Sequence, residues 1–135
     1  MLTTETLADL QRQVEAVYVD PALIEYAVRM VAATRAPEQH GINELGRYIT
    51  YGASPRASIN LILSAKALAF VRGRDYALPQ DVLDMSLDVL RHRLVLSYEA
   101  LTDDVTTDDL LRTIIARIPV PVVPLHGHSD IRVSA

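Results

Sequence analysis

The 135 residues contain no cysteine and no excess of basic side chains, since 13 lysines and arginines stand against 17 aspartates and glutamates. Without cysteine the sequence forms no disulfide, no zinc–thiolate site and no thiol nucleophile. With a formal net charge of −4, it lacks the basic excess by which nucleic-acid-binding modules displace counterions from phosphates. We therefore expect no nucleic acid among the partners.

A long hydrophobic run is also absent. The longest apolar stretch, residues 59–71, is interrupted by Asn60, Ser64 and Lys66, so it is too short and too polar to cross a bilayer. The first residues carry Thr, Glu, Asp and Gln where a signal peptide has an apolar core. We expect no membrane contact and a cytoplasmic location, which the lack of cysteine suits.

Half of the residues are apolar, which is enough for one domain with a sizeable core. Helix signals recur along it. Asp20 followed by Pro21 is typical of a helix start, because Asp accepts free backbone N–H groups and Pro is favoured in the first turn. A helix is predicted from here to about Arg35, before Pro37. Its apolar stripe consists of Leu23, Ile24, Ala27, Val28 and Val31.

Ser54 followed by Pro55 repeats this signal, with Ser54 as the expected cap. The helix that follows is predicted to end near Arg72, before Gly73. Its apolar residues lie nearly all round the helix, which favours a central position surrounded by other helices. Three further helices are predicted, one capped by Thr6, one starting at Pro79 with a leucine stripe, and one capped by Thr106 with Asp109 three residues later.

The predicted fold class is therefore all-α, a compact bundle of four to five helices. We assign residues 1–124 to this domain and residues 125–135 to a mobile C-terminal tail. Residues 37–53 are predicted to be a loop with a brief extended piece at 48–51. A short two-stranded β element is also expected, in which residues 94–98 pair with residues 17–19.

Several candidate sites carry little signal. Gly41 and Gly46 have the spacing of a phosphate-binding loop, but Arg47 and Tyr48 follow where that loop needs Lys and then Ser or Thr. The pair His126 and His128 has no third metal ligand nearby, and a histidine-containing tail is favoured.

Two clusters of charge remain. The acidic group lacks the spacing of a calcium loop, so capping and solvation are expected of it. The basic residues form either a solvated face or a surface that meets an acidic neighbour or a nucleotide. The acidic group is Asp103, Asp104, Asp108 and Asp109, and the basic group is Arg72, Arg74, Arg91 and Arg93.

The most informative position is Arg56, in the first turn of the helix that Ser54 and Pro55 introduce. A cation there faces the positive end of the helix dipole and costs about 0.3–1 kcal/mol. Helix N-termini bind anions, and a guanidinium adds a planar fork of donors suited to phosphate. The segment Gly52, Ala53, Ser54, Pro55 and Arg56 is thus a candidate anion-binding corner. The alternative is a solvated or ion-paired arginine.

The run Tyr51-Gly-Ala-Ser-Pro-Arg-Ala57 resembles the signature that opens the C-terminal lid of MoxR-type AAA+ ATPases. The likeness covers about residues 3 to 121. It includes the runs 19–23, 33–35, 65–69, 72–76, 79–82 and 89–96. One departure is Leu78, which precedes Pro79 where many members have a Ser or Thr cap.

This resemblance implies a lid domain that follows a nucleotide-binding core, so that the sequence is part of a longer protein. Arg56 would be the sensor 2 residue, which reaches the γ-phosphate of ATP. ATP and Mg²⁺ would bind to the full-length parent and not to this part alone. The implied partners are the AAA+ core of the same and neighbouring subunits in a ring, usually a hexamer. Proteins with von Willebrand factor A domains are implied as clients of a chaperone-like remodelling activity.

Two other classes of function are weighed against this one. A helical module that docks on another protein without touching nucleotide would use the apolar content and the arginine clusters equally well. A small stand-alone enzyme is disfavoured, because no constellation of catalytic side chains has a diagnostic context.

Overall fold

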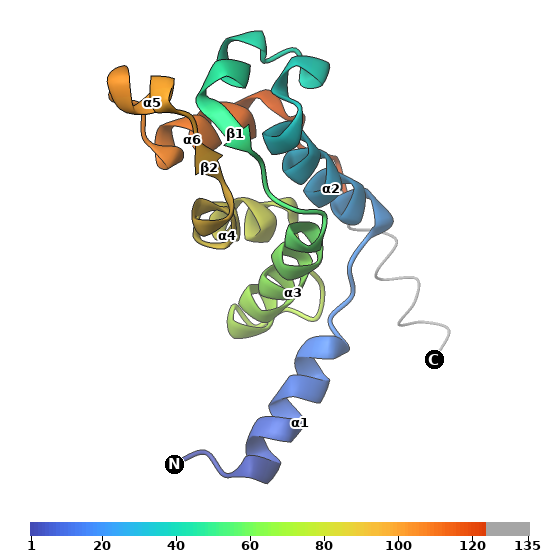
Figure 1. Cartoon of the computed structure of the whole chain (residues 1–135). Helices are drawn as coiled ribbons and strands as arrows, with labels where there is room; N and C mark the ends of the chain where they lie inside the picture. The colour runs from blue at the N-terminus through green and yellow to red at the C-terminus, as the bar shows by residue number, and fades with distance from the viewer. Residues whose placement is uncertain (124–135) are drawn as a thin grey trace.

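The computed structural model describes residues 1–123. It confirms the all-α prediction with one short two-stranded sheet (Figure 1). The predicted tail at 125–135, with His126 and His128, lies outside the described residues. Within residues 1–123 no helix has the length and apolarity needed to cross a membrane. In chain order the elements are α1 (Thr4–Glu15), α2 (Pro21–Arg35), η1 (Pro37–His40), η2 (Asn43–Tyr48), β1 (Ile49–Tyr51), α3 (Arg56–Val71), α4 (Pro79–Leu90), η3 (Arg91–Arg93), β2 (Val95–Leu96), α5 (Tyr98–Thr102) and α6 (Thr107–Arg117).

The core lies between α2, α3, α4 and α6. Helix α3 packs most extensively against α4 and next against α2, while α6 contacts both α2 and α4. Burying these apolar side chains supplies the main driving force for folding. The largest fully buried side chains are Tyr26, Leu23, Met30, Ile42, Leu61, Leu90, Leu110, Leu111, Ile114 and Val82, with Thr34 and Asp81 as the polar exceptions.

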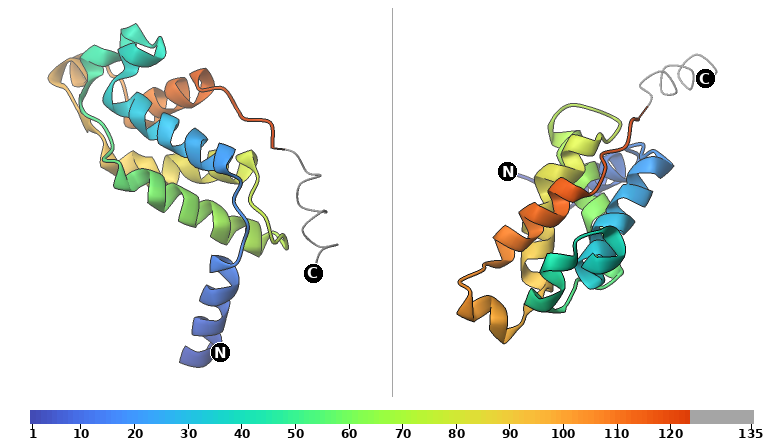
Figure 2. Two further views of the ribbon diagram at one scale, coloured as in Figure 1. Left: turned by 90° about the vertical axis from the view of Figure 1, so that its right-hand side faces the viewer. Right: turned by 90° about the horizontal axis from the view of Figure 1, so that it is seen from above.

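Helix α1 stands apart from this bundle and points away from it (Figures 1 and 2). It has no buried residue, and Lys66 Nζ on α3 donates to the Glu15 carbonyl over 2.8 Å at its end. The prediction that Thr6 caps it is wrong. The helix starts at Thr4, and the Thr3 hydroxyl accepts from the Thr6 amide at 3.1 Å.

Two other predicted helix starts are confirmed. The Asp20 carboxylate accepts from the Ala22 amide at 2.8 Å, and Thr106 and Asp109 cap each other's backbone amides at 3.1 and 3.2 Å. At the third start, Leu78 cannot cap with its side chain. The carboxylate of Asp81 accepts from the Leu78 amide at 2.7 Å instead, so one half of the capping arrangement survives.

The two-stranded element is present, but its predicted pairing is wrong. Strand β2 pairs antiparallel with β1, so residues 49–51 and not 17–19 supply the second strand. Tyr18 forms a parallel bridge with Tyr76, in which the Tyr18 amide donates to Asp75 and its carbonyl accepts from Ala77, both at 2.9 Å. The segment 37–53 is also less irregular than expected, because η1 and η2 fill its first part.

The position of α3 differs from the prediction as well. Its fully buried side chains are small except for Leu61, and although α4, α2 and the end of α1 pack against it, part of its apolar surface stays exposed. Ile59 is 61% exposed, Leu63 51% and Val71 80%. An apolar circumference favours burial but does not supply a neighbour for every side of the helix. A central helix was therefore the wrong expectation, and one apolar side of α3 is open.

Candidate functional site

The corner that leads from β1 into α3 is pressed against the end of α2. A Cβ added to Gly52 would lie 2.3 Å from the Thr34 carbonyl oxygen and 2.6 Å from the Arg35 nitrogen. Both are backbone atoms, which cannot rotate away as a flexible side chain would. Glycine is therefore required at this position by the close approach of two backbone segments.

Thr34 fixes the next residue of the corner. Its side chain is fully buried and donates to the Val31 carbonyl over 2.6 Å, while its oxygen accepts from the Ala53 amide at 2.9 Å. Ala53 and Ala57 are themselves fully buried. Thr34 was not among the predicted site residues, although it lies within the run 33–35 that resembles the lid family.

Helix α3 begins at Arg56, and Pro55 occupies the N-cap position. The prediction that the Ser54 side chain caps this helix is wrong, because no side chain caps it. The Ala57 amide donates to the Ser54 carbonyl at 2.9 Å, and the Ser58 amide donates to the Pro55 carbonyl at 3.1 Å. Since proline has no N–H and these two amides are engaged, the first turn offers an anion mainly the Arg56 side chain.

Arg56 is exposed. Among residues 1–123, no acidic side chain lies within 4.0 Å of its guanidinium and no side chain hydrogen-bonds to it. The structure thus places Arg56 at the start of a helix, outside the bundle, with its donors open to a ligand. Gly52 and Ala53 position it from inside, while Ser54 and Pro55 are exposed beside it.

The arginines at the other end of α3 are engaged within the chain. The Asp81 carboxylate, fully buried, receives Arg72 at 2.9 Å and Arg74 at 2.6 Å, and Arg72 also reaches Asp84 at 2.6 Å. Burial alone would raise the pKa of Asp81, but hydrogen bonds from Arg74, the Leu78 amide and Arg72 outweigh it and hold that pKa below its ordinary value.

In the second basic pair, Arg91 and Arg93 differ in their partners. Arg91 forms two hydrogen bonds with Asp108, at 2.7 and 2.9 Å. Hydrogen bonding by Arg91 is the main cause that lowers the pKa of Asp108. Arg93 has no acidic side chain within 4.0 Å among residues 1–123, and its Nε donates to the Val89 carbonyl at 3.0 Å. Of the four clustered arginines, Arg93 therefore keeps a free guanidinium edge.

The weaker candidates find structural roles. Gly41 terminates η1 with a φ of +75°, and Gly46 lies inside η2, so neither belongs to a loop between a strand and a helix. Asp109 is a cap and Asp108 an ion-pair partner, and Asp103 accepts from the Tyr48 hydroxyl at 2.9 Å. No group of three potential metal ligands occurs in the described part of the chain.

Comparison with known proteins shows which family this chain resembles. The family model described as the AAA lid domain matches residues 42–114. The sequence is 46% identical over 132 residues to "Chaperone MoxR1" of Mycobacterium tuberculosis, covering 96% of this chain and 35% of that protein. It is 34% identical over 110 residues to "Protein MoxR" of Paracoccus denitrificans, covering 77% of this chain and 32% of that protein.

A solved structure shares the fold. It is described as a presumed ATPase from Cytophaga hutchinsonii and superposes with a TM-score of 0.85 at 36% identity, covering 87% of this chain and 36% of that one. The chain thus spans about a third of the length of each relative. The matched segment contains the corner from Gly52 to Arg56 and helix α3, whereas Thr34 at the end of α2 lies before it. The chain belongs to the AAA lid domain family, in the form carried by MoxR-type AAA+ ATPases.

Proposed function

We propose that this domain is the nucleotide-sensing lid of a MoxR-type ATPase and that Arg56 contacts the γ-phosphate of ATP. The observation that supports this most is the exposed guanidinium of Arg56, which has no acidic partner among residues 1–123 and is held at the start of α3 by the close contact of Gly52 and the buried Ala53 with α2. A free arginine at the positive end of a helix lowers stability. Bidentate binding of a phosphate offsets that cost many times over.

In this proposal Arg56 stabilises developing charge and takes no part in bond making. Phosphoryl transfer concentrates negative charge on the γ-phosphate, and an arginine aimed at this charge lowers the barrier. The described residues supply no cluster of acidic ligands for Mg²⁺. We therefore expect the remaining two thirds of the parent to bind ATP and Mg²⁺, and the lid to complete the site with Arg56.

The partner in this proposal is the AAA+ core, either of the same subunit or of the next one in a ring. The parent would then couple ATP hydrolysis to chaperone-like remodelling of client proteins. Clients with von Willebrand factor A domains and a hexameric ring are part of the same proposal and rest on the family resemblance alone. The named similarity to a chaperone supports this direction.

The experiment is ATP turnover by the full-length parent carrying Arg56→Ala. A charge-assisted hydrogen bond contributes about 1.5–3 kcal/mol, so turnover should fall about 10- to 100-fold. Arg56→Lys keeps the charge but loses the fork and should recover only part of the rate. Arg29→Ala is the matched control, since it removes an exposed arginine of α2 whose partner is Glu25 one turn away.

Full turnover by the Arg56→Ala parent, with Arg29→Ala also active, would exclude the nucleotide role. The alternative of a helical interaction module without nucleotide contact would then account better for the exposed apolar side of α3.

A further inference from the structure

A groove runs between the middle of α3 and the end of α4. Its volume is about 600 Å³, which is within the usual range for ligand sites in proteins. Asn60, Leu63 and Ser64 of α3 line one wall, and Val89 of α4 and Arg93 of η3 line the other. We call this hollow the α3–η3 groove.

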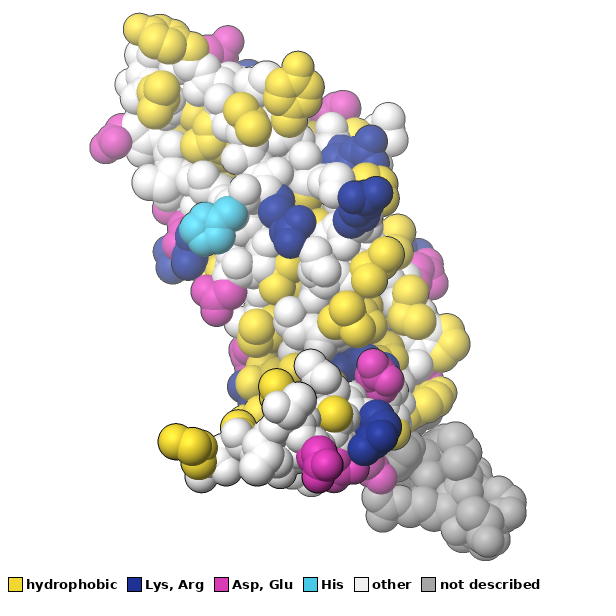
Figure 3. Space-filling model, turned by 60° about the horizontal axis from the view of Figure 1, so that its bottom comes forward, with side chains coloured by type: hydrophobic (Ala, Val, Ile, Leu, Met, Phe, Trp, Pro, Cys, Tyr) yellow, Lys and Arg dark blue, Asp and Glu magenta, His cyan; other side chains and the backbone are white. Residues whose placement is uncertain are grey.

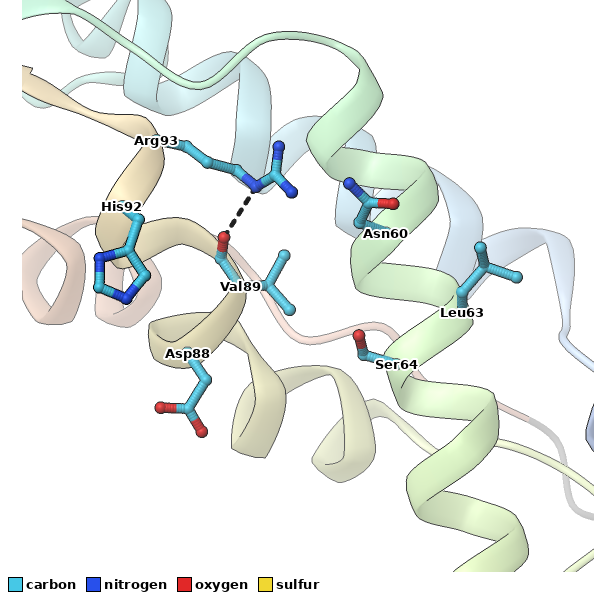
Figure 4. Close-up of a pocket in the computed structure, with 7 residues that line it drawn as sticks. All are labelled: Asn60, Leu63, Ser64, Asp88, Val89, His92 and Arg93. Atoms are coloured by element: carbon cyan, nitrogen blue, oxygen red, sulfur yellow. Dashed lines mark hydrogen bonds between the residues drawn. The ribbon is translucent and has the colours of Figure 1, made fainter.

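Arg93 is held at its root and free at its tip. Its Nε donates to the Val89 carbonyl over 3.0 Å, and among residues 1–123 no acidic side chain lies within 4.0 Å of its guanidinium. Figure 4 shows the guanidinium extending from η3 toward α3, where Asn60 faces it. Its two terminal nitrogens are therefore placed for a bidentate contact with a planar anion such as a carboxylate.

Two polar side chains on the opposite wall have no hydrogen-bond partner within residues 1–123. Asn60 and Ser64 lie one turn apart on α3, and both are half-buried. Hydroxyls inside helices commonly bond back to a carbonyl one turn earlier, as those of Ser86, Thr102 and Thr113 do. The Ser64 hydroxyl does not, and Figure 4 shows it directed into the groove.

The other charged or titratable side chains of the groove point elsewhere. Asp88 is the one acidic side chain that lines it, and it lies 3.4 Å from Arg91. Figure 4 shows Asp88 and His92 directed away from Arg93 and from α3. The groove thus presents a guanidinium that no carboxylate of its own occupies, and a fitting ligand carries negative charge.

The rest of the lining is apolar. Leu63 is 51% exposed, and Val89 is half-buried on the facing wall. Basic and hydrophobic side chains also lie next to one another on the face of the molecule drawn in Figure 3. A ligand that fits the groove therefore combines carboxylates with apolar groups.

An extended peptide offers this combination with the right spacing. Its successive side chains point to opposite sides, so carboxylates at alternate positions face Arg93 while apolar side chains between them face Leu63. The carboxamide of Asn60 has both donors and an acceptor, which match the C=O and N–H groups of a peptide backbone. Ser64 lies about 6 Å further along the helix, close to the roughly 6.6 Å between alternate residues of an extended chain.

We propose that the α3–η3 groove binds an extended segment of a second protein in which acidic and apolar residues alternate. Arg93 holds a carboxylate of this segment, Asn60 and Ser64 bond its backbone, and Leu63 contacts its apolar side chains. The site does not include Arg56 and requires no nucleotide, so it goes beyond the proposed nucleotide-sensing function.

The test measures binding of a synthetic peptide to the full-length parent by fluorescence anisotropy. The probe is a fluorescein-labelled peptide of about six residues, long enough to span the groove when extended, in which leucine alternates with glutamate. The control peptide has lysine in place of each glutamate. We expect the leucine–glutamate peptide to bind at least about tenfold more tightly, because it forms charge-assisted hydrogen bonds with Arg93. Equal affinities, or no binding of either peptide, would overturn the proposal.

Variants assign this binding to the groove. Arg93→Ala should weaken binding of the leucine–glutamate peptide about tenfold or more, and Arg93→Glu should reverse the preference in favour of the leucine–lysine peptide. A merely structural role of Arg93 at the end of α4 would not reverse a charge preference. Arg29→Ala is the control, since it removes an exposed arginine on α2, and should leave both affinities unchanged. An unchanged preference in Arg93→Glu would contradict the site.

A photo-crosslinking leucine analogue in the peptide locates the site. Trypsin cuts after Arg56 and Lys66, so residues 57–66 carry Asn60, Leu63 and Ser64 in one fragment. Crosslinks to this fragment in the parent support the proposal. Crosslinks only to other fragments, or none because the parent's own chain fills the groove, contradict it. Peptide binding and the ATP turnover of Arg56→Ala are separate readouts, so this site and the nucleotide role can each fail alone.

Discussion

The two ends of α3 use arginine in opposite ways. At the C-terminal end, Arg72 and Arg74 converge on the buried carboxylate of Asp81 and tie α3 to the start of α4. At the N-terminal end, Arg56 is exposed and no acidic side chain in residues 1–123 lies within 4.0 Å of it. Arginine therefore forms ion pairs within the fold at one end, whereas at the other end it has no acidic partner among residues 1–123.

The two ends therefore differ in how much their arginines contribute to the stability of the fold. A buried carboxylate with two arginines is strongly destabilised when one partner is lost. An exposed arginine without a partner contributes little to the fold. Substitutions at the two ends should therefore separate folding from function.

The largest effect on folding is expected for Asp81→Asn. It removes the negative charge that Arg72 and Arg74 share, and the one remaining acceptor oxygen can no longer serve both arginines and the Leu78 amide. Because both arginines are partly exposed, we expect a loss of about 2–3 kcal/mol in the free energy of unfolding, which urea denaturation measures. The control is Asp88→Asn, whose single contact is an exposed 3.4 Å pair with Arg91, and which should cost less than about 0.5 kcal/mol. An equal loss of unfolding free energy in Asp81→Asn and Asp88→Asn would contradict the stabilising role of the buried Asp81 cluster.

A second prediction concerns the backbone at the N-terminal end of α3, independently of the Arg56 side chain. Gly52→Ala forces a Cβ against the Thr34 backbone and should cost about 1–3 kcal/mol. Gly46→Ala is a matched control, because its Cβ would meet only Glu38 Oε2, at 3.5 Å. Denaturation of both variants checks this. If Gly52→Ala is as stable as the wild type, the corner can move away from α2 without loss of stability, and the close contact does not fix the position of Arg56.

The smallest effect is a pH dependence at the C-terminal end. The pKa values of Asp81 and Asp84 lie below their ordinary range, so both carboxylates stabilise the fold above their unfolded pKa of about 3.9. That contribution is lost as the pH falls through the lower folded pKa values. The thermal midpoint of unfolding should therefore decrease as the pH is lowered below about 4. The decrease should be smaller in Asp81→Asn than in the wild type. A midpoint that rises or stays level on acidification would contradict the assignment.

Local signals in the sequence predicted the elements well. Asp20 with Pro21 and Thr106 with Asp109 marked true helix starts, because capping depends on residues only a few positions apart. Pairing of the short strand at 95–96 was not predictable in this way. Its partner 49–51 is brought to it by the packing of the whole chain, and two or three residues carry too little pattern to select it.

The sequence predicted that Arg56 lies at the start of a helix, but it did not predict which residues hold that corner in place. Arg56 was marked by its unfavourable place in a helix and by the lid signature around it. Thr34, nineteen residues before Ala53, gave no local sign that its hydroxyl would hold the Ala53 amide. Nor could the clusters of basic residues reveal that Arg72, Arg74 and Arg91 form ion pairs while Arg93 has no acidic partner among residues 1–123, because ion pairing depends on tertiary neighbours.

The most direct test measures turnover and unfolding together for two arginines at opposite ends of α3, in the full-length parent. For Arg56→Ala we expect turnover to fall about 10- to 100-fold with the unfolding transition of the lid unchanged. For Arg72→Ala we expect the unfolding transition to move to lower denaturant, because Asp81 loses one of its two arginines. Wild-type turnover in Arg56→Ala would contradict the central claim that this arginine is kept free for the phosphate.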